Sequence, residues 1–220
     1  MSDDIAKRLL RDIAYGGIHP AHRNKPRAGF DPTPTMIVCP YVAGKLARPT
    51  QEALAMWPAP ITWCQLPTDD HGAYGRLFRD LWRRGETFVI CEQDIVPTVD
   101  QLAEISTCGH DWCYYGYDDN LYPEGPMFGL VRFDGRVMAE HPDAADRALS
   151  GSDGAGWQAP WWHVDSLVCR DLTIRLARPA PEGDGPDAQE WARHPWKRAG
   201  CVTHLPPVHH AHVGPPSGPQ

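Results

Sequence analysis

Short apolar segments alternate with amphipathic segments through the first half of the chain, and this alternation restricts the possible folds more than any other feature. Apolar runs of strand length, rich in β-branched and aromatic residues, occupy 35–39, 61–66, 88–91 and 112–117. Segments with helical spacing separate them at 50–57, 72–84 and 98–106. The alternation predicts an α/β fold with a mostly parallel central sheet and helices on both of its faces.

The composition indicates a soluble globular protein. Of the 220 residues, 42% are hydrophobic and 22% are charged, and no apolar stretch approaches the roughly 20 residues that a membrane-spanning helix needs. The first ten residues lack a basic start followed by an apolar block, so no secretion signal is visible. We therefore expect a cytoplasmic protein that does not enter a membrane.

Cysteine usage and net charge argue against further classes of protein. The seven cysteines are odd in number, widely spaced and without a C-x-x-C pair, which predicts free thiols rather than a disulfide framework or a zinc knuckle. The net charge of −7 argues against a general attraction to nucleic acid. A short basic stretch at 22–27 (H-R-N-K-P-R) leaves a local nucleic-acid contact open.

Two carboxylates stand at the end of the third apolar run. Residues 87–97 read T-F-V-I-C-E-Q-D-I-V-P, so the run stops at Glu92 and Asp94. If the backbone stays extended, both acids lie on one side, where they can share a cation or a ligand. Ligands of parallel sheets bind beyond the carboxyl ends of the strands. The alternative is a buried strand that ends in an ordinary polar turn.

Three segments in this order resemble the GT-A fold, the Rossmann-like fold of nucleotide-sugar-dependent glycosyltransferases, here of the small bacterial or phage type. They are T-M-I-V-C-P-Y-V-A-G, G-A-Y-G-R-L-F-R-D-L-W-R-R-G and F-V-I-C-E-Q-D-I-V-P. The last resembles the family's D-x-D element, with Glu92 in place of the first acid. The similarity in element order spans Thr35 to Val213.

The resemblance implies a site for Mn²⁺ or Mg²⁺ that bridges the diphosphate of a UDP-sugar or another nucleoside-diphosphate sugar. Its metal ligands would be Glu92 and Asp94, with a later histidine. The segment T-H-L-P-P-V-H-H-A-H-V at 203–213 supplies His210 and His212, which would share a face in an extended backbone. The alternative is a proline-rich tail with surface histidines.

The same resemblance implies donor-binding residues near the carboxyl ends of the first and third strands. Pro40, Tyr41 and Val42, directly after the first strand, would cradle the nucleotide base. Gln93, between the two acids, and Arg76, on the helix before the third strand, would contact the donor. Arginines on such a helix are more often part of a solvated face.

The segment W-W-H-V-D-S-L at 161–167 is predicted to contain the residues that bind and activate the acceptor. Asp165 is the candidate catalytic base because a carboxylate beside aromatic walls has its pKa raised by desolvation. Trp161, Trp162 and His163 would contact the acceptor. The alternative makes Asp165 the N-cap of a helix and the tryptophans part of the core, and the two interpretations are compatible.

These assignments divide one domain into four parts. Residues 1–34 are an N-terminal helix and a proline-rich basic segment, 35–117 the nucleotide-sugar-binding half, 118–213 the acceptor-side half and 214–220 a disordered tail. The predicted activity is metal-dependent transfer of a sugar to a hydroxyl, and the acceptor stays open between a hydroxymethylated base in phage DNA, a protein and a small glycan. A nucleotidyltransferase and a non-catalytic binding module are the alternatives.

Overall fold

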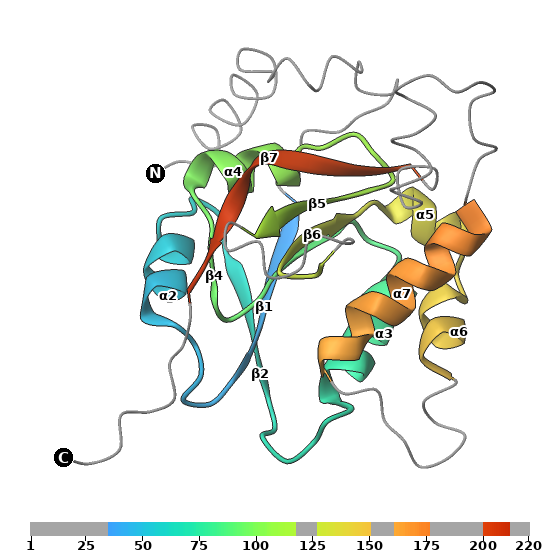
Figure 1. Cartoon of the computed structure of the whole chain (residues 1–220), viewed down its shortest axis with the longest axis horizontal. Coiled ribbons are helices and arrows are strands. Elements are labelled where there is room, and N and C mark those ends of the chain that lie inside the picture. Colours follow the sequence, from blue (N-terminus) through green and yellow to red (C-terminus); the bar gives the residue numbers. More distant parts are fainter. Residues whose placement is uncertain (1–34, 118–126, 151–160, 177–199, 212–220) are drawn as a thin grey trace.

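One mixed sheet forms the centre of the protein (Figure 1). The computed structural model describes residues 35–117, 127–150, 161–176 and 200–211. Within these residues the strands are β1 (Met36–Val42), β2 (Ile61–Leu66), β3 (Phe88–Cys91), β4 (Ile95–Val96), β5 (Trp112–Tyr117), β6 (Leu130–Phe133) and β7 (Cys201–His210). The helices are α2 (Arg48–Ala55), α3 (Ala73–Arg84), α4 (Val99–Ser106), α5 (Gly135–Glu140), α6 (Ala144–Ser150) and α7 (Trp161–Leu176).

The strands of the described residues follow the spatial order β2-β1-β3-β6-β5-β7-β4. β1 is parallel to β2 and β3, and β6 runs antiparallel to both β3 and β5. β7 is parallel to β5, and β4 is antiparallel to β7. All strands except β6 and β4 therefore point the same way, which confirms the predicted α/β class with a mostly parallel sheet.

Helices cover both faces of the sheet, as the continuous apolar runs predict. Along β3 the side chains alternate: Phe88 and Ile90 belong to one buried core, and Val89 and Cys91 to the other. The first core includes residues of α3, α6 and α7, and the second includes residues of α2 and α4. Figure 1 shows these two groups of helices on opposite sides of the strands.

The aromatic centre of the first core explains how α3 is fixed to the sheet. Phe78 stacks on Phe128 with ring centroids 5.2 Å apart and meets Phe133 edge-on at 5.5 Å. Aromatic pairs of this kind each contribute about 0.5–1.5 kcal/mol beyond the apolar area that they bury. The helix ends where Gly85 adopts the left-handed conformation with φ 69°, a conformation that costs glycine little.

Two predicted boundaries near the first strand are wrong. β1 continues through Val42 because Pro40, Tyr41 and Val42 pair in register with the last three residues of β2. These residues therefore belong to the strand and not to the loop that follows it. The first helix begins at Arg48, two residues before Thr50, which is buried inside the helix and does not cap it.

The histidine-rich segment near the C-terminus is a strand rather than a tail. β7 lies between β5 and β4, and its pairing with β5 is interrupted by a shift of register between Tyr115 and Tyr117. Pro206 and Pro207 fall within this irregular stretch, where missing N–H groups disturb the ladder least. Their carbonyl groups accept hydrogen bonds from Gln101 Nε2 at 3.1 and 3.3 Å.

Some predictions fall outside the described residues. These are the helix and basic segment of 1–34, the parts of the acceptor-side half at 118–126, 151–160, 177–199 and 212–213, and the tail of 214–220. Both predicted halves of the domain contribute strands to the same sheet, since β6 lies between β3 and β5. Among the residues that the structure describes, every helix is too short or too polar to cross a bilayer.

Candidate functional site

Tyr117, the last residue of β5, interacts electrostatically with three carboxylates and stacks on a histidine. Burial raises the pKa of Tyr117 well above its usual value, and the charges of Glu92, Asp94 and Asp165 raise it further. The ring of His210 stacks on the Tyr117 ring with centroids 5.0 Å apart. We call these five residues the carboxylate cluster. Because β3, β5 and β7 run in one direction and end here, the cluster lies at the carboxyl edge of the sheet, where ligands of such folds bind.

Glu92 begins a turn directly after β3. Its N–H donates to the Gly129 carbonyl at 2.8 Å, and its own carbonyl accepts from the Ile95 N–H at 3.1 Å. The backbone is therefore not extended through Glu92 and Asp94, and the expectation that strand alternation aligns the two acids is wrong. The carboxylate of Glu92 accepts a hydrogen bond of 2.7 Å from the Tyr74 hydroxyl, which directs it toward the start of α3.

Asp94 is held beside His210 by strand pairing. Ile95 of β4 pairs with His210 of β7, and the Asp94 carbonyl accepts a hydrogen bond of 2.7 Å from the Ala211 N–H. Asp94 Oδ2 consequently lies 3.5 Å from His210 Nε2. The structure brings these two predicted metal ligands together, whereas His212 lies outside the described residues.

Two of the predicted donor-binding residues, Gln93 and Arg76, lie in different surroundings. Gln93 fixes the turn to β1, because its side-chain oxygen accepts from the Val42 N–H at 2.8 Å and its carbonyl accepts from the Ala47 N–H at 2.8 Å. Arg76 is exposed and forms an ion pair with Asp70. Arg76 follows Tyr74 by two residues, or about 200° around the helix, so it faces away from the side of α3 that contacts Glu92.

The other three residues of this set, Pro40, Tyr41 and Val42, lie in β1. The Tyr41 hydroxyl donates to Gln65 Oε1 at 3.4 Å, and the Tyr41 ring meets Trp63 edge-on with centroids 6.3 Å apart. Pro40 is buried. Tyr41 therefore presents a partly exposed aromatic surface near the carboxyl end of β1.

Asp165 lies within α7, four residues after its first residue, so the interpretation of Asp165 as an N-cap is wrong. The helix starts earlier, at Trp161. Burial raises the pKa of Asp165, although hydrogen bonds from the backbone and side chain of Ser166 oppose the shift. The nearby His163 also lowers this pKa. The side chains of Trp161 and Trp162 lie outside the described residues.

The sequence analysis did not identify Tyr74 and Tyr117. Burial raises the pKa of Tyr74 well above its ordinary value, as do the charge of Glu92 and the hydrogen bond to it. Asp165 and Tyr117 raise it further. Both tyrosines therefore interact electrostatically with Glu92 and with Asp165. The sequence offered one signal for each residue: Tyr117 is the last residue of a predicted strand, and Tyr74 lies near the start of a predicted helix.

Gly129 packs directly against Tyr117 of the carboxylate cluster. A Cβ atom at this position would lie 2.2 Å from the Tyr117 hydroxyl oxygen and 2.4 Å from a ring carbon, far inside van der Waals contact. Gly129 also supplies the carbonyl that receives the Glu92 N–H. The lack of a side chain here lets the Tyr117 ring lie against the backbone that orients Glu92.

Replacing Gly129 by alanine should displace Tyr117 and destabilise the protein by about 1–3 kcal/mol, the usual range for overpacking a buried site. The change in the free energy of unfolding is measured by urea denaturation. Gly116→Ala is the control, because a Cβ atom at Gly116 would meet nothing within 4 Å. Equal stability of the two variants would contradict the close packing of Tyr117 on Gly129.

The donor set of the cluster suits a hard divalent cation. Carboxylate oxygens and a neutral imidazole are common ligands of Mn²⁺, and carboxylates also bind Mg²⁺. Glu92, Asp94 and His210 do not form a compact group within the part of the chain that is described; the group of three donors found there within 4.8 Å of one another is a different one. Of these three residues, Asp94 and His210 lie next to each other. Glu92 instead accepts a hydrogen bond from Tyr74.

Comparison with known proteins gives no family for this chain. No family model matches it, and neither the curated proteins nor the solved structures contain a match.

Proposed function

We propose that the protein is a metal-dependent glycosyltransferase of the GT-A type that moves a sugar from a nucleoside-diphosphate sugar to a hydroxyl acceptor. The observation that carries the proposal is the placement of Asp94 Oδ2 3.5 Å from His210 Nε2, where His210 stacks on Tyr117 and the charges of Glu92, Asp94 and Asp165 raise the pKa of Tyr117. Glu92 and Asp94 come from the turn after β3 and Asp165 from α7, and the turn lies at the carboxyl edge of a mostly parallel sheet. Partly buried acids that repel one another are costly to keep without a cation or a ligand.

Asp94 and His210 are the proposed cation ligands, with Glu92 joining them directly or through a water molecule. A bound Mn²⁺ or Mg²⁺ would stabilise the negative charge that develops on the leaving diphosphate. The hydrogen bond from Tyr74 keeps the Glu92 carboxylate at the edge of the site. Asp94 is aligned by the pairing of β4 with β7, which also presents His210.

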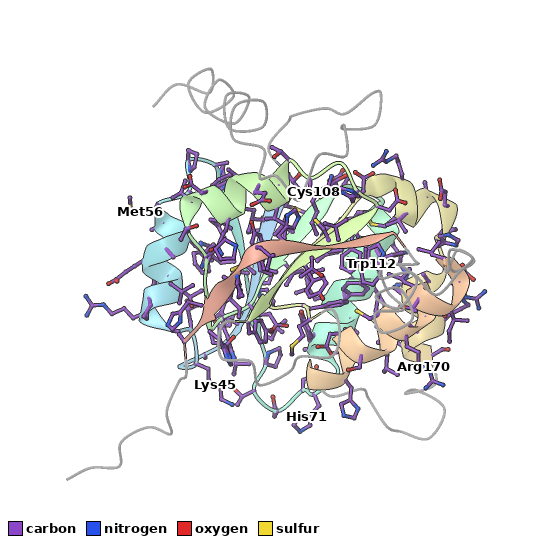
Figure 2. All side chains as sticks on the ribbon, turned by 45° about the horizontal axis from the view of Figure 1, so that its top comes forward. Lys45, Met56, His71, Cys108, Trp112 and Arg170 are labelled. Atoms are coloured by element: carbon purple, nitrogen blue, oxygen red, sulfur yellow. The ribbon has the colours of Figure 1, made fainter. Side chains whose placement is uncertain are left out.

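The donor would lie along the carboxyl ends of β1 and β3. Tyr41 offers an aromatic face to the nucleotide base, and Gln93 fixes the turn under the diphosphate by holding Val42. Figure 2 shows Lys45, in the loop after β1, and His71, in the loop before α3, at the same edge of the molecule. Arg76 remains a proposed donor contact on the outer surface of this edge.

Asp165 would act as the base that accepts the proton of the acceptor hydroxyl. Its pKa is raised by burial, and a carboxylate in that state is a stronger base than an exposed one. Asp165 is partly buried, and its charge raises the pKa of both Tyr74 and Tyr117. His163 and the tryptophans Trp161 and Trp162 remain the proposed acceptor contacts.

The proposal is tested with the full chain, a panel of nucleoside-diphosphate sugars, and Mn²⁺ or EDTA. A matching donor at 100 times its dissociation constant should stabilise the fold by about 2.7 kcal/mol, which corresponds to a rise of roughly 5–10 °C in melting temperature for a chain of this size. Slow Mn²⁺-stimulated release of the nucleoside diphosphate should accompany binding.

The same assay separates the alternative functions. A nucleotidyltransferase would release pyrophosphate from a nucleoside triphosphate and leave the sugar nucleotides intact. A binding module would release neither product. If no sugar nucleotide raises the melting temperature or is cleaved with Mn²⁺ present, the proposed glycosyl transfer is wrong.

A further inference from the structure

A second group of donor atoms lies at the opposite edge of the molecule. One atom each from Cys108, Cys113 and His204 lies within 4.8 Å of the other two, and all three residues are buried. Their exposed fractions are 8%, 0% and 2%. Figure 2 shows Cys108 at the far side of the sheet from Lys45 and His71. The group is therefore separate from the carboxylate cluster.

The sheet brings these side chains together by its register. Cys113 is the second residue of β5 and pairs with Val202, whereas Tyr115 pairs with His204. Residues two apart on a strand share a face, so Cys113 and His204 lie on the same side of adjacent strands. That side is the core that includes residues of α4, and Cys108 reaches it from the loop between α4 and β5.

A fourth donor lies beside Cys108, although it is not one of the three atoms that lie within 4.8 Å of one another. His110 Nδ1 lies 3.3 Å from Cys108 Sγ, a separation typical of two ligands on one tetrahedral zinc ion, whose bonds are about 2.0–2.3 Å long. The four residues supply two sulfur and two nitrogen atoms. This is the Cys₂His₂ donor set of structural zinc sites, read here as Cys-x-His-x-x-Cys followed by a distant histidine.

His204 is oriented as metal-binding histidines usually are. Its Nδ1 lies 3.0 Å from Glu104 Oε1, so Nε2 is the ring nitrogen directed toward the thiols. The other oxygen of Glu104 accepts a hydrogen bond of 2.6 Å from the Tyr115 hydroxyl. A carboxylate that holds the second nitrogen of the imidazole fixes the ring and raises its basicity as a ligand.

We propose that Cys108, His110, Cys113 and His204 bind one structural Zn²⁺ ion. Cys108, Cys113 and His204 would hold the ion, and His110 would complete the tetrahedral shell by turning toward it. With no open position left, the ion would tie the loop after α4 to β5 and β7 rather than catalyse a reaction. Binding would release the thiol protons still present. The proposal does not depend on the proposed glycosyl transfer, because it concerns other residues at another edge.

The test begins with the wild-type full chain purified without chelators. Elemental analysis by mass spectrometry should find one zinc per chain. Replacement of zinc by Co²⁺ should produce the sulfur-to-cobalt charge-transfer band and the intense visible bands of tetrahedral cobalt thiolates. Such a band cannot come from the carboxylate cluster, which has no sulfur ligand.

Variants then assign the ligands. Cys113→Ser and His204→Ala should lose at least half of the bound zinc and the charge-transfer band, and Cys201→Ala should keep both. Cys201 is a matched control because it is equally buried and belongs to β7, but it belongs to the core on the other face of the sheet. Asp94→Asn should also keep both, since it changes only the carboxylate cluster.

If the ligand variants do not fold, the wild-type chain still decides the matter. Removal of zinc with a strong chelator should lower the melting temperature, and added Zn²⁺ should restore it at one equivalent. Wild-type protein that carries no zinc, develops no charge-transfer band with Co²⁺ and keeps its melting temperature under chelation would overturn the proposal. A Cys108–Cys113 disulfide in that protein, detected by thiol counting, would overturn it equally.

Discussion

Replacing Asp94 by asparagine should reduce Mn²⁺-dependent cleavage of the sugar nucleotide by about 10²–10³-fold, the usual cost of removing one group that stabilises developing charge. Asparagine keeps the shape of the side chain and removes its negative charge. His210 Nε2, 3.5 Å from Asp94 Oδ2, would then be the nearer remaining ligand of the proposed cation. The rate is measured as nucleoside diphosphate released over a series of Mn²⁺ concentrations.

The variant should need more Mn²⁺ for half-maximal activity and should retain its fold. Asp94 is partly exposed and its backbone carbonyl, not its side chain, accepts the hydrogen bond from Ala211. Asp100→Asn is the matched control, because Asp100 is an exposed acid in the first turn of α4. If Asp94→Asn cleaves the donor as fast as Asp100→Asn and with the same Mn²⁺ dependence, Asp94 does not hold the cation.

The local chemistry of the sequence was sufficient to predict much of the sheet. The runs at 61–66, 88–91 and 112–117 match β2, β3 and β5 in their bounds, because short β-branched and aromatic segments bounded by polar or proline residues have few other stable conformations. The helix over 98–106 was also visible. Thr98 and Gln101 form the reciprocal capping interaction that this spacing predicts.

The features that the sequence left unresolved depend on contacts between distant segments. β7 contains two prolines, which argue against a strand until the irregular pairing with Tyr115 and Tyr117 is seen. The Cys₂His₂ group was not foreseen because its last histidine is 91 positions from Cys113, and only the parallel register of β5 and β7 places the two on one face. Tyr117 lies in an ordinary strand sequence, and its position among the acids follows from the sheet order.

The candidate site was predicted in part because its acids end an apolar run. Glu92 and Asp94 are one residue apart, and the resemblance to a D-x-D element drew attention to both. Their geometry could not be predicted, because the turn between Glu92 and Ile95 directs them to different partners. Glu92 contacts Tyr74 from α3, and Asp94 lies beside His210 from β7.

Replacing Asp165 by asparagine should lower sugar transfer by about 10²–10⁴-fold, the range that general base catalysis contributes. A base acts only when it is ionised. Because burial raises the pKa of Asp165 above its ordinary value of 3.8, the wild-type rate should fall with decreasing pH at a point above that value. The acidic limb of the pH–rate profile should be absent from the residual activity of Asp165→Asn.

The same substitution should not weaken the fold. A raised pKa means that ionised Asp165 is less favourable in the folded chain than in the unfolded chain, so the unfolded state loses this proton first as pH rises. The wild-type protein therefore loses some stability between the ordinary and the raised pKa, and the asparagine variant avoids that loss. At neutral pH its free energy of unfolding, measured with urea, should equal or exceed that of the wild type.

Asp171→Asn provides the contrasting control on the same helix. The carboxylate of Asp171 lies 3.0 Å from Arg147 and 3.3 Å from Arg175, so its loss should lower stability and leave the rate and its pH dependence nearly unchanged. Asp165→Asn should therefore lose activity and keep its stability, whereas Asp171→Asn should keep its activity and lose stability. An Asp165→Asn enzyme that transfers sugar at the wild-type rate, or that keeps the wild-type acidic limb, would show that another group accepts the proton.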